Sequence, residues 1–166
     1  KSDWINHIST VFPEVRLKSY IELRGADGGP WSRVCALPAF WTGILYDENV
    51  LDETYNLIEK WSFSDVNKFY IDVRKDGLKA YDPNGKPLYK TLKKFLDLST
   101  FGLKNRKIFQ NDEDESIFLS PLKKILESGK SPAETWKNLF LSEWNENIDK
   151  IYKANYFKIL EHNEKI

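Results

Sequence analysis

A carboxylate and a guanidinium lie two residues apart near the start of this 166-residue chain, at Glu22 and Arg24. In a β-strand, side chains at this spacing leave the same face roughly 7 Å apart. The carboxylate can then hold a magnesium ion while the guanidinium binds the phosphate that the ion bridges. Arg16 and Lys18 extend the positive charge along the same face. An exposed strand with ion pairs to a neighbouring strand gives the same pattern, and the pattern alone favours that explanation.

Apolar and polar residues alternate along 14–24, and this period of two predicts one continuous β-strand. One side carries Val15, Leu17, Ser19, Ile21 and Leu23, and the other carries Arg16, Lys18, Tyr20, Glu22 and Arg24. We expect the apolar side to rest on helices and the polar side to line a cleft. Residues 25–30 contain three glycines and a proline, which predicts a loop after the strand.

Apolar residues at helical spacing predict a mostly helical region from residue 34 onward. The uncharged run 34–46 is the best candidate for a buried segment, with Pro38 at its start or kinking it. A helix is expected over 64–74, capped by Ser64. Residues 77–87 predict a turn-rich connection or a small hairpin.

Three signals predict the helices of the C-terminal third. Gly129 is a good C-terminal stop for the apolar stripe that precedes it. Ser131 to Glu134 combines a cap, a first-turn proline and a reciprocal glutamate, which predicts the start of a helix. A last helix is expected over about 148–160.

Composition excludes several classes of protein. Twenty-five basic and twenty-five acidic residues give a net charge of zero, which argues against a nucleic-acid-binding surface. The longest uncharged run, 34–46, is too short for a membrane span of about 20 residues, and the first ten residues do not resemble a signal peptide. Cys35 is the single cysteine, so an internal disulfide is impossible and we expect a reducing compartment, the cytoplasm.

Other chemistry has little support in the sequence. His7 and His162 lie at opposite ends of the chain, and no phosphate loop, dinucleotide fingerprint or paired-cysteine zinc spacing is present. Four consecutive acids at 112–115 are better explained as an exposed loop or the first turn of a helix than as a cation site.

Three runs of sequence nevertheless resemble one family. They are Phe12–Lys18, Tyr20–Trp31 and Ala36–Asp47, and shorter stretches at 77–79, 102–103 and 128–134 agree with them. Together they are similar to the plant and proteobacterial type of glutamate–cysteine ligase. The likeness extends from Trp4 to about Trp144, with the matching positions in order and at family-like spacing.

The resemblance implies a fold and a reaction. The expected fold class is α+β and predominantly helical, with one strand (about 14–24) of an antiparallel glutamine-synthetase-like sheet followed by a C-terminal helical layer. The implied reaction joins L-glutamate to L-cysteine through γ-glutamyl phosphate, the first step of glutathione synthesis. It uses ATP as a substrate and Mg²⁺ as a cofactor.

The resemblance also assigns roles to individual residues. The family's Tyr-x-Glu-x-Arg strand matches Tyr20, Glu22 and Arg24. It implies that Glu22 is a magnesium ligand and that Arg24 neutralises the transferring phosphoryl group. Tyr20 belongs to the substrate-binding set, as does Arg16, a candidate for a substrate carboxylate or phosphate. Trp31 and Arg33, just beyond the glycine loop, are candidates for closing the pocket.

Family members run to several hundred residues, and most of their sheet and metal carboxylates lie upstream of this region. We therefore expect residues 1–166 to be a single C-terminal portion, with the active-site strand and loop in 1–33 and a helical region in 34–166. Activity is expected only with an N-terminal fragment or subunit. Two alternatives remain open: a non-catalytic helical module or remnant of such a ligase, and a related carboxylate–amine ligase with another amine acceptor.

Overall fold

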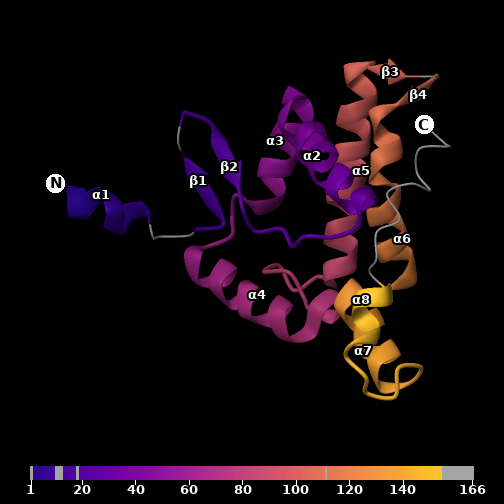
Figure 1. Ribbon diagram of the computed structural model, residues 1–166. Coiled ribbons are helices and arrows are strands. Elements are labelled where there is room, and N and C mark those ends of the chain that lie inside the picture. Colours follow the sequence, from indigo (N-terminus) through magenta and orange to yellow (C-terminus); the bar gives the residue numbers. More distant parts are fainter. Residues whose placement is uncertain (1, 10–12, 18, 111, 155–166) are drawn as a thin grey trace.

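The computed structural model describes residues 2–9, 13–17, 19–110 and 112–154 of the chain. Helices dominate, with two small antiparallel pairs of strands (Figure 1). In chain order the elements are α1 (Ser2–Ser9), β1 (Val15–Leu17), β2 (Ile21–Leu23), α2 (Trp31–Leu45), α3 (Glu48–Ile58), α4 (Phe63–Asp76), the 3₁₀ helix η1 (Gly77–Lys79), α5 (Leu88–Arg106), β3 (Phe109–Gln110), β4 (Glu113–Asp114), the 3₁₀ helix η2 (Glu115–Leu119), α6 (Ser120–Ser128), α7 (Pro132–Leu141) and α8 (Lys150–Ala154). The expected α+β, predominantly helical class is confirmed.

The hydrophobic core lies where α2 and α5 pack side by side, with η2 and α6 against them (Figure 1). Leu96, Leu103 and Leu119 are buried at its centre, and Phe40 of α2 packs against them. This contact holds α2 against α5 in a close-packed core.

Two glycines let α2 and α5 approach at backbone distance. A Cβ on Gly43 would overlap the Ser99 carbonyl oxygen, and a Cβ on Gly102 would overlap the Gly43 carbonyl oxygen. The Ser99 hydroxyl donates a 2.9 Å hydrogen bond to the Phe40 carbonyl at the same crossing. Glycine is therefore required at these two helical positions for packing and not for its freedom of φ.

Helix α2 begins at Trp31, three residues before the expected segment, with Pro30 as the N-cap residue. Pro38 lies inside this helix and not at its start, so of the two expectations only the kink at Pro38 stays a prediction. Helix α4 begins at Phe63 with Ser62 as its cap, so the prediction of Ser64 is wrong as well. Ser62 and Asp65 form a reciprocal capping box, which Ser64 has no acidic residue at the right spacing to make.

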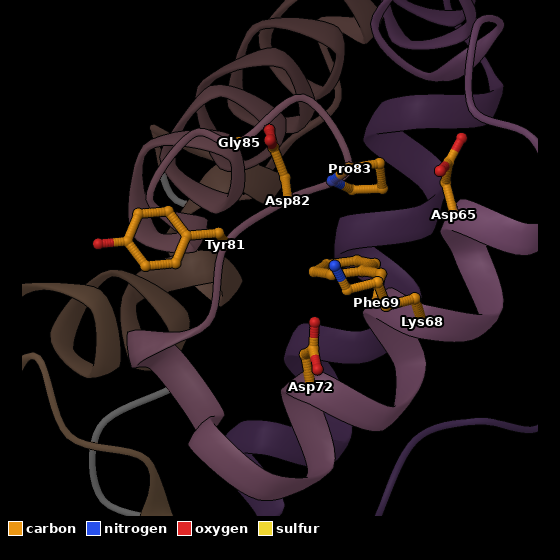
Figure 2. A pocket seen from close by; sticks show the side chains of 8 residues that line it. All are labelled: Asp65, Lys68, Phe69, Asp72, Tyr81, Asp82, Pro83 and Gly85. Atoms are coloured by element: carbon orange, nitrogen blue, oxygen red, sulfur yellow. The ribbon is translucent and has the colours of Figure 1, made fainter.

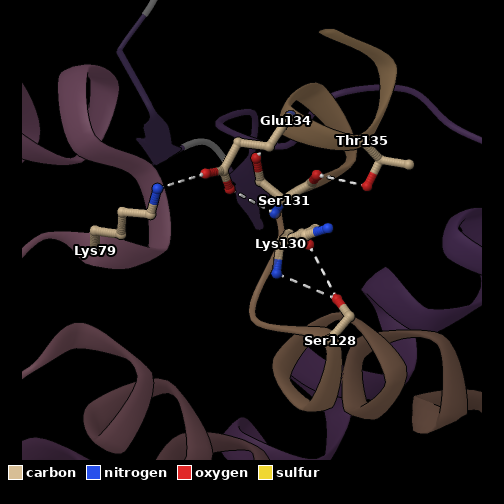
Figure 3. A network of polar contacts seen from close by, with 6 residues as sticks. All are labelled: Lys79, Ser128, Lys130, Ser131, Glu134 and Thr135. Carbon is tan, nitrogen blue, oxygen red and sulfur yellow. Dashed lines mark hydrogen bonds and ion pairs between the residues drawn. The ribbon is translucent and has the colours of Figure 1, made fainter. Parts of the chain in front are cut away.

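The caps predicted for the C-terminal third are confirmed. Gly129 ends α6 in the left-handed conformation, with φ of 63°. The Ser131 hydroxyl accepts from the Glu134 N–H, while the Glu134 carboxylate accepts from the Ser131 N–H and lies 3.5 Å from Lys79 Nζ (Figure 3). Helix α8 is described only to Ala154, and the rest of the helix predicted to residue 160 lies outside the described residues.

The segment 77–87 is a 3₁₀ turn and a tight loop with a single β-bridge between Tyr81 and Pro87. Asp82 is buried and accepts hydrogen bonds from the N–H groups of Asn84 and Lys86 and from the Thr91 hydroxyl. Its carboxylate thus shapes the turn.

The acidic run 112–115 serves local structure. The Asp114 side chain caps η2 by accepting from the Ser116 N–H, and Glu115 forms a 2.9 Å ion pair with Arg106. Of the four acids that were interpreted as an exposed loop or a helix first turn, only Glu115 lies in a first turn, that of η2, while Glu113 and Asp114 form β4. No helix in the described part of the chain is long and apolar enough to span a membrane.

Candidate functional site

The segment 14–24 is a hairpin and not the single strand that its periodicity predicted. Strand β1 pairs with β2 in antiparallel register, with Arg16 opposite Glu22 and Leu17 opposite Ile21. Between the two strands, Ser19 is the single residue of a type that is common in turns, and it is a weaker turn former than glycine, proline, asparagine or aspartate. Lys18 lies outside the described residues.

The polar face of the hairpin brings Arg16 and Glu22 together. Arg16 Nε donates to Glu22 Oε2 at 2.7 Å, and a second guanidinium nitrogen lies 2.7 Å from the same oxygen. Both side chains are about 30% exposed. Glu22, the candidate metal ligand, is thus paired with Arg16 of the facing strand. This is the arrangement expected if the polar pattern reflects ion pairs between neighbouring strands.

The apolar face is more exposed than the polar face. Leu17 is 82%, Ile21 58% and Val15 53% exposed. The expectation that this side rests on helices is therefore wrong for Val15, Leu17 and Ile21, whereas Leu23 is half-buried. Among the described elements, β1 and β2 pack extensively only against each other.

Arg24 follows β2 directly, and its N–H donates to the Glu14 carbonyl at 2.8 Å. The Glu14 carboxylate accepts a 3.0 Å hydrogen bond from the Tyr70 hydroxyl on α4 and lies against Gly25. Glu14 and Tyr70 therefore link the open end of the hairpin to α4. Sequence reasoning missed this link because Glu14 and Tyr70 are 56 residues apart in the chain and no local pattern connects them.

The other predicted residues lie at the ends of these elements. Tyr20 is 57% exposed in the turn of the hairpin, and Trp31 is 62% exposed at the first position of α2. Arg33 folds back so that its guanidinium lies against Gly29 of the loop. The structure thus brings Arg16 and Glu22 into contact and holds Arg33 against the loop that joins the hairpin to α2.

The described residues do not form a magnesium site by themselves. No three histidine, cysteine, aspartate or glutamate side chains in that part of the chain come together as metal ligands. Magnesium in phosphoryl-transfer sites is bound through one or two carboxylates, with phosphates and water as the remaining ligands. Glu22 can therefore be one ligand of such a site and no more.

A cavity of about 220 Å³ lies between α4 and the turn at 81–85, and none of the predicted site residues lines it (Figure 2). It is lined by Asp65, Lys68, Phe69, Asp72, Tyr81, Asp82, Pro83 and Gly85. Two of its three carboxylates have structural roles, since Asp65 caps α4 and Asp82 shapes the turn. We do not assign the candidate site to this cavity.

Hydrogen bonding lowers the pKa of several carboxyl groups, and each of them belongs to a cap. The Asn105 side-chain amide, followed by the Val50 N–H, holds the pKa of Asp47 below its usual 3.8. Hydrogen bonds from Ser131 lower the pKa of Glu134 in the same way. These shifts mark stabilised helix starts and not catalytic groups.

The sequence profile of the glutamate–cysteine ligase family 2 (GCS2) matches residues 1–154. The chain belongs to glutamate–cysteine ligase family 2. The family expected from the hairpin, the glycine loop and the Ala36–Asp47 run is therefore confirmed.

Curated relatives agree with this assignment. The chloroplastic glutamate–cysteine ligase of Medicago truncatula is 40% identical over 151 residues, which is 91% of this chain and 28% of that protein. Those of Solanum lycopersicum and Arabidopsis thaliana are 40% and 38% identical over 152 residues, 92% of this chain and 28% of each relative. The chain thus spans somewhat over a quarter of the length of these relatives.

The expectation of a cytoplasmic protein is wrong. All three of these relatives are named as chloroplastic proteins. The expectation rested on Cys35 being the single cysteine. One cysteine excludes an internal disulfide, but it does not distinguish one reducing compartment from another.

Proposed function

We propose that this chain forms part of an ATP-dependent ligase that joins the γ-carboxylate of L-glutamate to the amine of L-cysteine, the first step of glutathione biosynthesis. The γ-carboxylate attacks the terminal phosphorus of ATP, and ADP leaves. The cysteine amine then attacks the acyl carbon of γ-glutamyl phosphate, and phosphate leaves as the amine loses a proton. The observation that carries this proposal is the family match over residues 1–154.

The proposal assigns this chain one wall of the active site. The relatives are more than three times as long as their matched segment, and the described residues offer one carboxylate, Glu22, to a metal. The remaining groups therefore come from a longer polypeptide, as an N-terminal fragment or subunit or as the same chain. The names of the relatives favour a plastid as the place where this enzyme works.

In this proposal the charged residues of the hairpin bind the substrates and neutralise their negative charge. Arg24 neutralises the charge on the transferring phosphoryl group, and Arg16 binds a carboxylate or phosphate of a substrate. Tyr20, Trp31 and Arg33 line the substrate side of the same region. Glu22 contributes one carboxylate to a magnesium site, and magnesium bound to nucleotide phosphates lowers their negative charge. The family motif supports this set, because Tyr20, Glu22 and Arg24 match its Tyr-x-Glu-x-Arg strand.

A chimera tests the proposal. The matched segment of the Medicago truncatula relative is replaced by this chain, and the purified protein is assayed for γ-glutamylcysteine and ADP with ATP, magnesium, glutamate and cysteine. We expect product, and we expect Arg24→Ala to lower kcat by about 10²-fold or more, the effect of losing one preorganised electrostatic group. Lys137→Ala, which removes an exposed cation from α7, is the control.

Three results separate this proposal from its rivals. A chimera that folds, judged by circular dichroism, but forms neither product nor ADP would favour a non-catalytic module. Full activity in the Arg24→Ala chimera would show that Arg24 has no catalytic role. Faster turnover with an amine other than cysteine would identify a ligase with another acceptor.

A further inference from the structure

Arg24 lies at the junction between the hairpin and a loop rich in glycine. The loop 25–30 contains three glycines and one proline, and glycine allows more backbone conformations than any other residue. Among the described elements, β1 and β2 pack extensively only against each other. The loop and these packing contacts therefore do not by themselves fix the position of Arg24 relative to the helices.

Tyr70 of α4 supplies a second attachment between the hairpin and the helices. Its hydroxyl donates a 3.0 Å hydrogen bond to Glu14 Oε1, although the two residues are 56 positions apart in the chain. The Arg74 guanidinium, about one turn further along α4, lies 5.4 Å from the centre of the Tyr70 ring. This cation–π contact helps to hold the ring in the position from which its hydroxyl reaches the hairpin. Figure 1 shows the hairpin next to α4, with the glycine loop running from it to α2.

Glu14 transmits this restraint to Arg24. The Glu14 carbonyl accepts a 2.8 Å hydrogen bond from the Arg24 N–H, so the backbone at the two residues is held together. The Glu14 carboxylate also lies against the first residue of the loop. A Cβ at Gly25 would be 2.5 Å from Glu14 Oε2, so a larger residue there would displace the carboxylate that Tyr70 binds. Glu14 thus contacts α4 through its side chain and Arg24 through its backbone.

We propose that Tyr70 is a positioning residue of the ligase, which acts through Glu14 to hold Arg24 in place for the transferring phosphoryl group. The inference rests on the proposed function for the role of Arg24. A cationic group stabilises a transition state best when it is already in position, and a displacement of about 1 Å can lower a rate by roughly 10²-fold. Tyr70 itself contacts no substrate in this proposal. Its loss should therefore lower kcat and leave KM nearly unchanged.

Tyr70→Phe in the chimera tests this role, because phenylalanine keeps the ring and removes the hydrogen-bond donor. We expect kcat to fall about 5-fold or more and the KM values for ATP and glutamate to stay within about 2-fold. Tyr55→Phe makes the same chemical change at a tyrosine that is 61% exposed on α3, and we expect it to behave as wild type. A wild-type kcat in Tyr70→Phe, beside an impaired Arg24→Ala chimera, would overturn the inference and leave the proposed function standing.

A double-mutant cycle distinguishes positioning from a simple loss of folded enzyme. If Tyr70 acts through Arg24, Tyr70→Phe should lower the rate of the Arg24→Ala chimera by less than about 2-fold, because the group that it positions is already absent. A smaller folded fraction would instead lower the rate by the same factor with and without Arg24. Equal factors in the two backgrounds would overturn the inference.

Hydrogen–deuterium exchange of the Arg24 amide in this chain, followed by NMR, tests the link without catalysis. We expect Tyr70→Phe to speed this exchange about 3-fold or more, and Tyr55→Phe to leave it unchanged. Unchanged exchange in Tyr70→Phe would overturn the inference even if the chimera is an active ligase. A chimera that forms no product would refute the proposed function, and the exchange measurement would still show whether Tyr70 restrains Arg24.

Discussion

Replacing Gly102 by alanine tests the close packing of α2 against α5. The added Cβ would lie 2.9 Å from the Gly43 carbonyl carbon and overlap the carbonyl oxygen. Ordinary contacts begin near 3.4 Å, so α2 and α5 must separate by at least about 0.5 Å along this line. The Gly43 carbonyl belongs to the backbone of α2, and a Cβ at residue 102 is attached directly to the backbone of α5. Neither can therefore rotate away from the other.

Two opposing contributions decide whether Gly102→Ala raises or lowers the free energy of unfolding. Alanine in a helix is more favourable than glycine by about 1 kcal/mol. Overpacking a core costs roughly 1–3 kcal/mol, and a backbone obstacle favours the upper part of that range. We therefore expect Gly102→Ala to lower the free energy of unfolding by about 1–2 kcal/mol, which corresponds to a fall in Tm of roughly 2–8 °C for a chain of this size.

Urea and thermal denaturation followed by circular dichroism measure this effect. Gly28→Ala is the control, because no atom lies within 4 Å of a Cβ at that position. We expect this control to be close to wild type. A Gly102→Ala protein that is as stable as wild type, or more stable, would show that α2 and α5 do not cross at backbone distance.

Three further predictions concern the caps and the ion pair. Ser62→Ala should destabilise the chain by about 1 kcal/mol in urea denaturation, while Ser64→Ala should be nearly neutral. A larger loss of stability in Ser64→Ala would show that Ser64 is the N-cap residue. The pKa of Asp47 is lowered on folding from 3.8, so its carboxylate adds stability above pH 3.8 that is lost as the pH falls through the lower folded value. The stability advantage of wild type over Asp47→Asn should therefore stay constant from pH 7 to about pH 5 and shrink in more acidic solution; an advantage that grows in acid would refute the assignment. Arg16→Gln should change stability by less than about 1 kcal/mol, because the pair with Glu22 is partly exposed, and should raise the KM of the chimera for glutamate or ATP; unchanged KM values for both would remove Arg16 from the substrate site.

Local sequence signals were sufficient to predict where several helices begin or end. The capping box at Ser131 and the stop at Gly129 could be predicted because each depends on residues within four positions of one another. The same rule, applied at Ser64, missed Ser62, although the acidic residue that decides between the two serines is Asp65, three positions after Ser62.

Contacts between distant segments could not be predicted from these patterns. Alternation along 14–24 describes one strand and two facing strands equally well, because residues paired across a hairpin share a face. The turn between them carries no strong turn former. The close approach of Gly43 and Gly102 joins residues far apart in the chain, and neither glycine looked different from a tolerated helical glycine.

The resemblance gave the family, but the candidate site depends on groups that the described residues do not contain. Glu22 and Arg24 were selected by their spacing and by the family motif. The structure adds the Arg16 partner of Glu22 and the connection from Glu14 to Tyr70. The first contact depends on the hairpin register, and the second joins the hairpin to a helix 56 residues away, so neither can be inferred from a one-strand interpretation.

The rate of γ-glutamylcysteine formation by the chimera carrying Glu22→Gln most directly tests whether this hairpin is a wall of a ligase active site. Glutamine keeps the size of the side chain and removes its negative charge, and Glu113→Gln on exposed β4 is the matched control. We predict that Glu22→Gln lowers kcat by about 10²-fold or more while the control stays within 2-fold of wild type. A folded Glu22→Gln chimera that forms product at the wild-type rate would contradict the account.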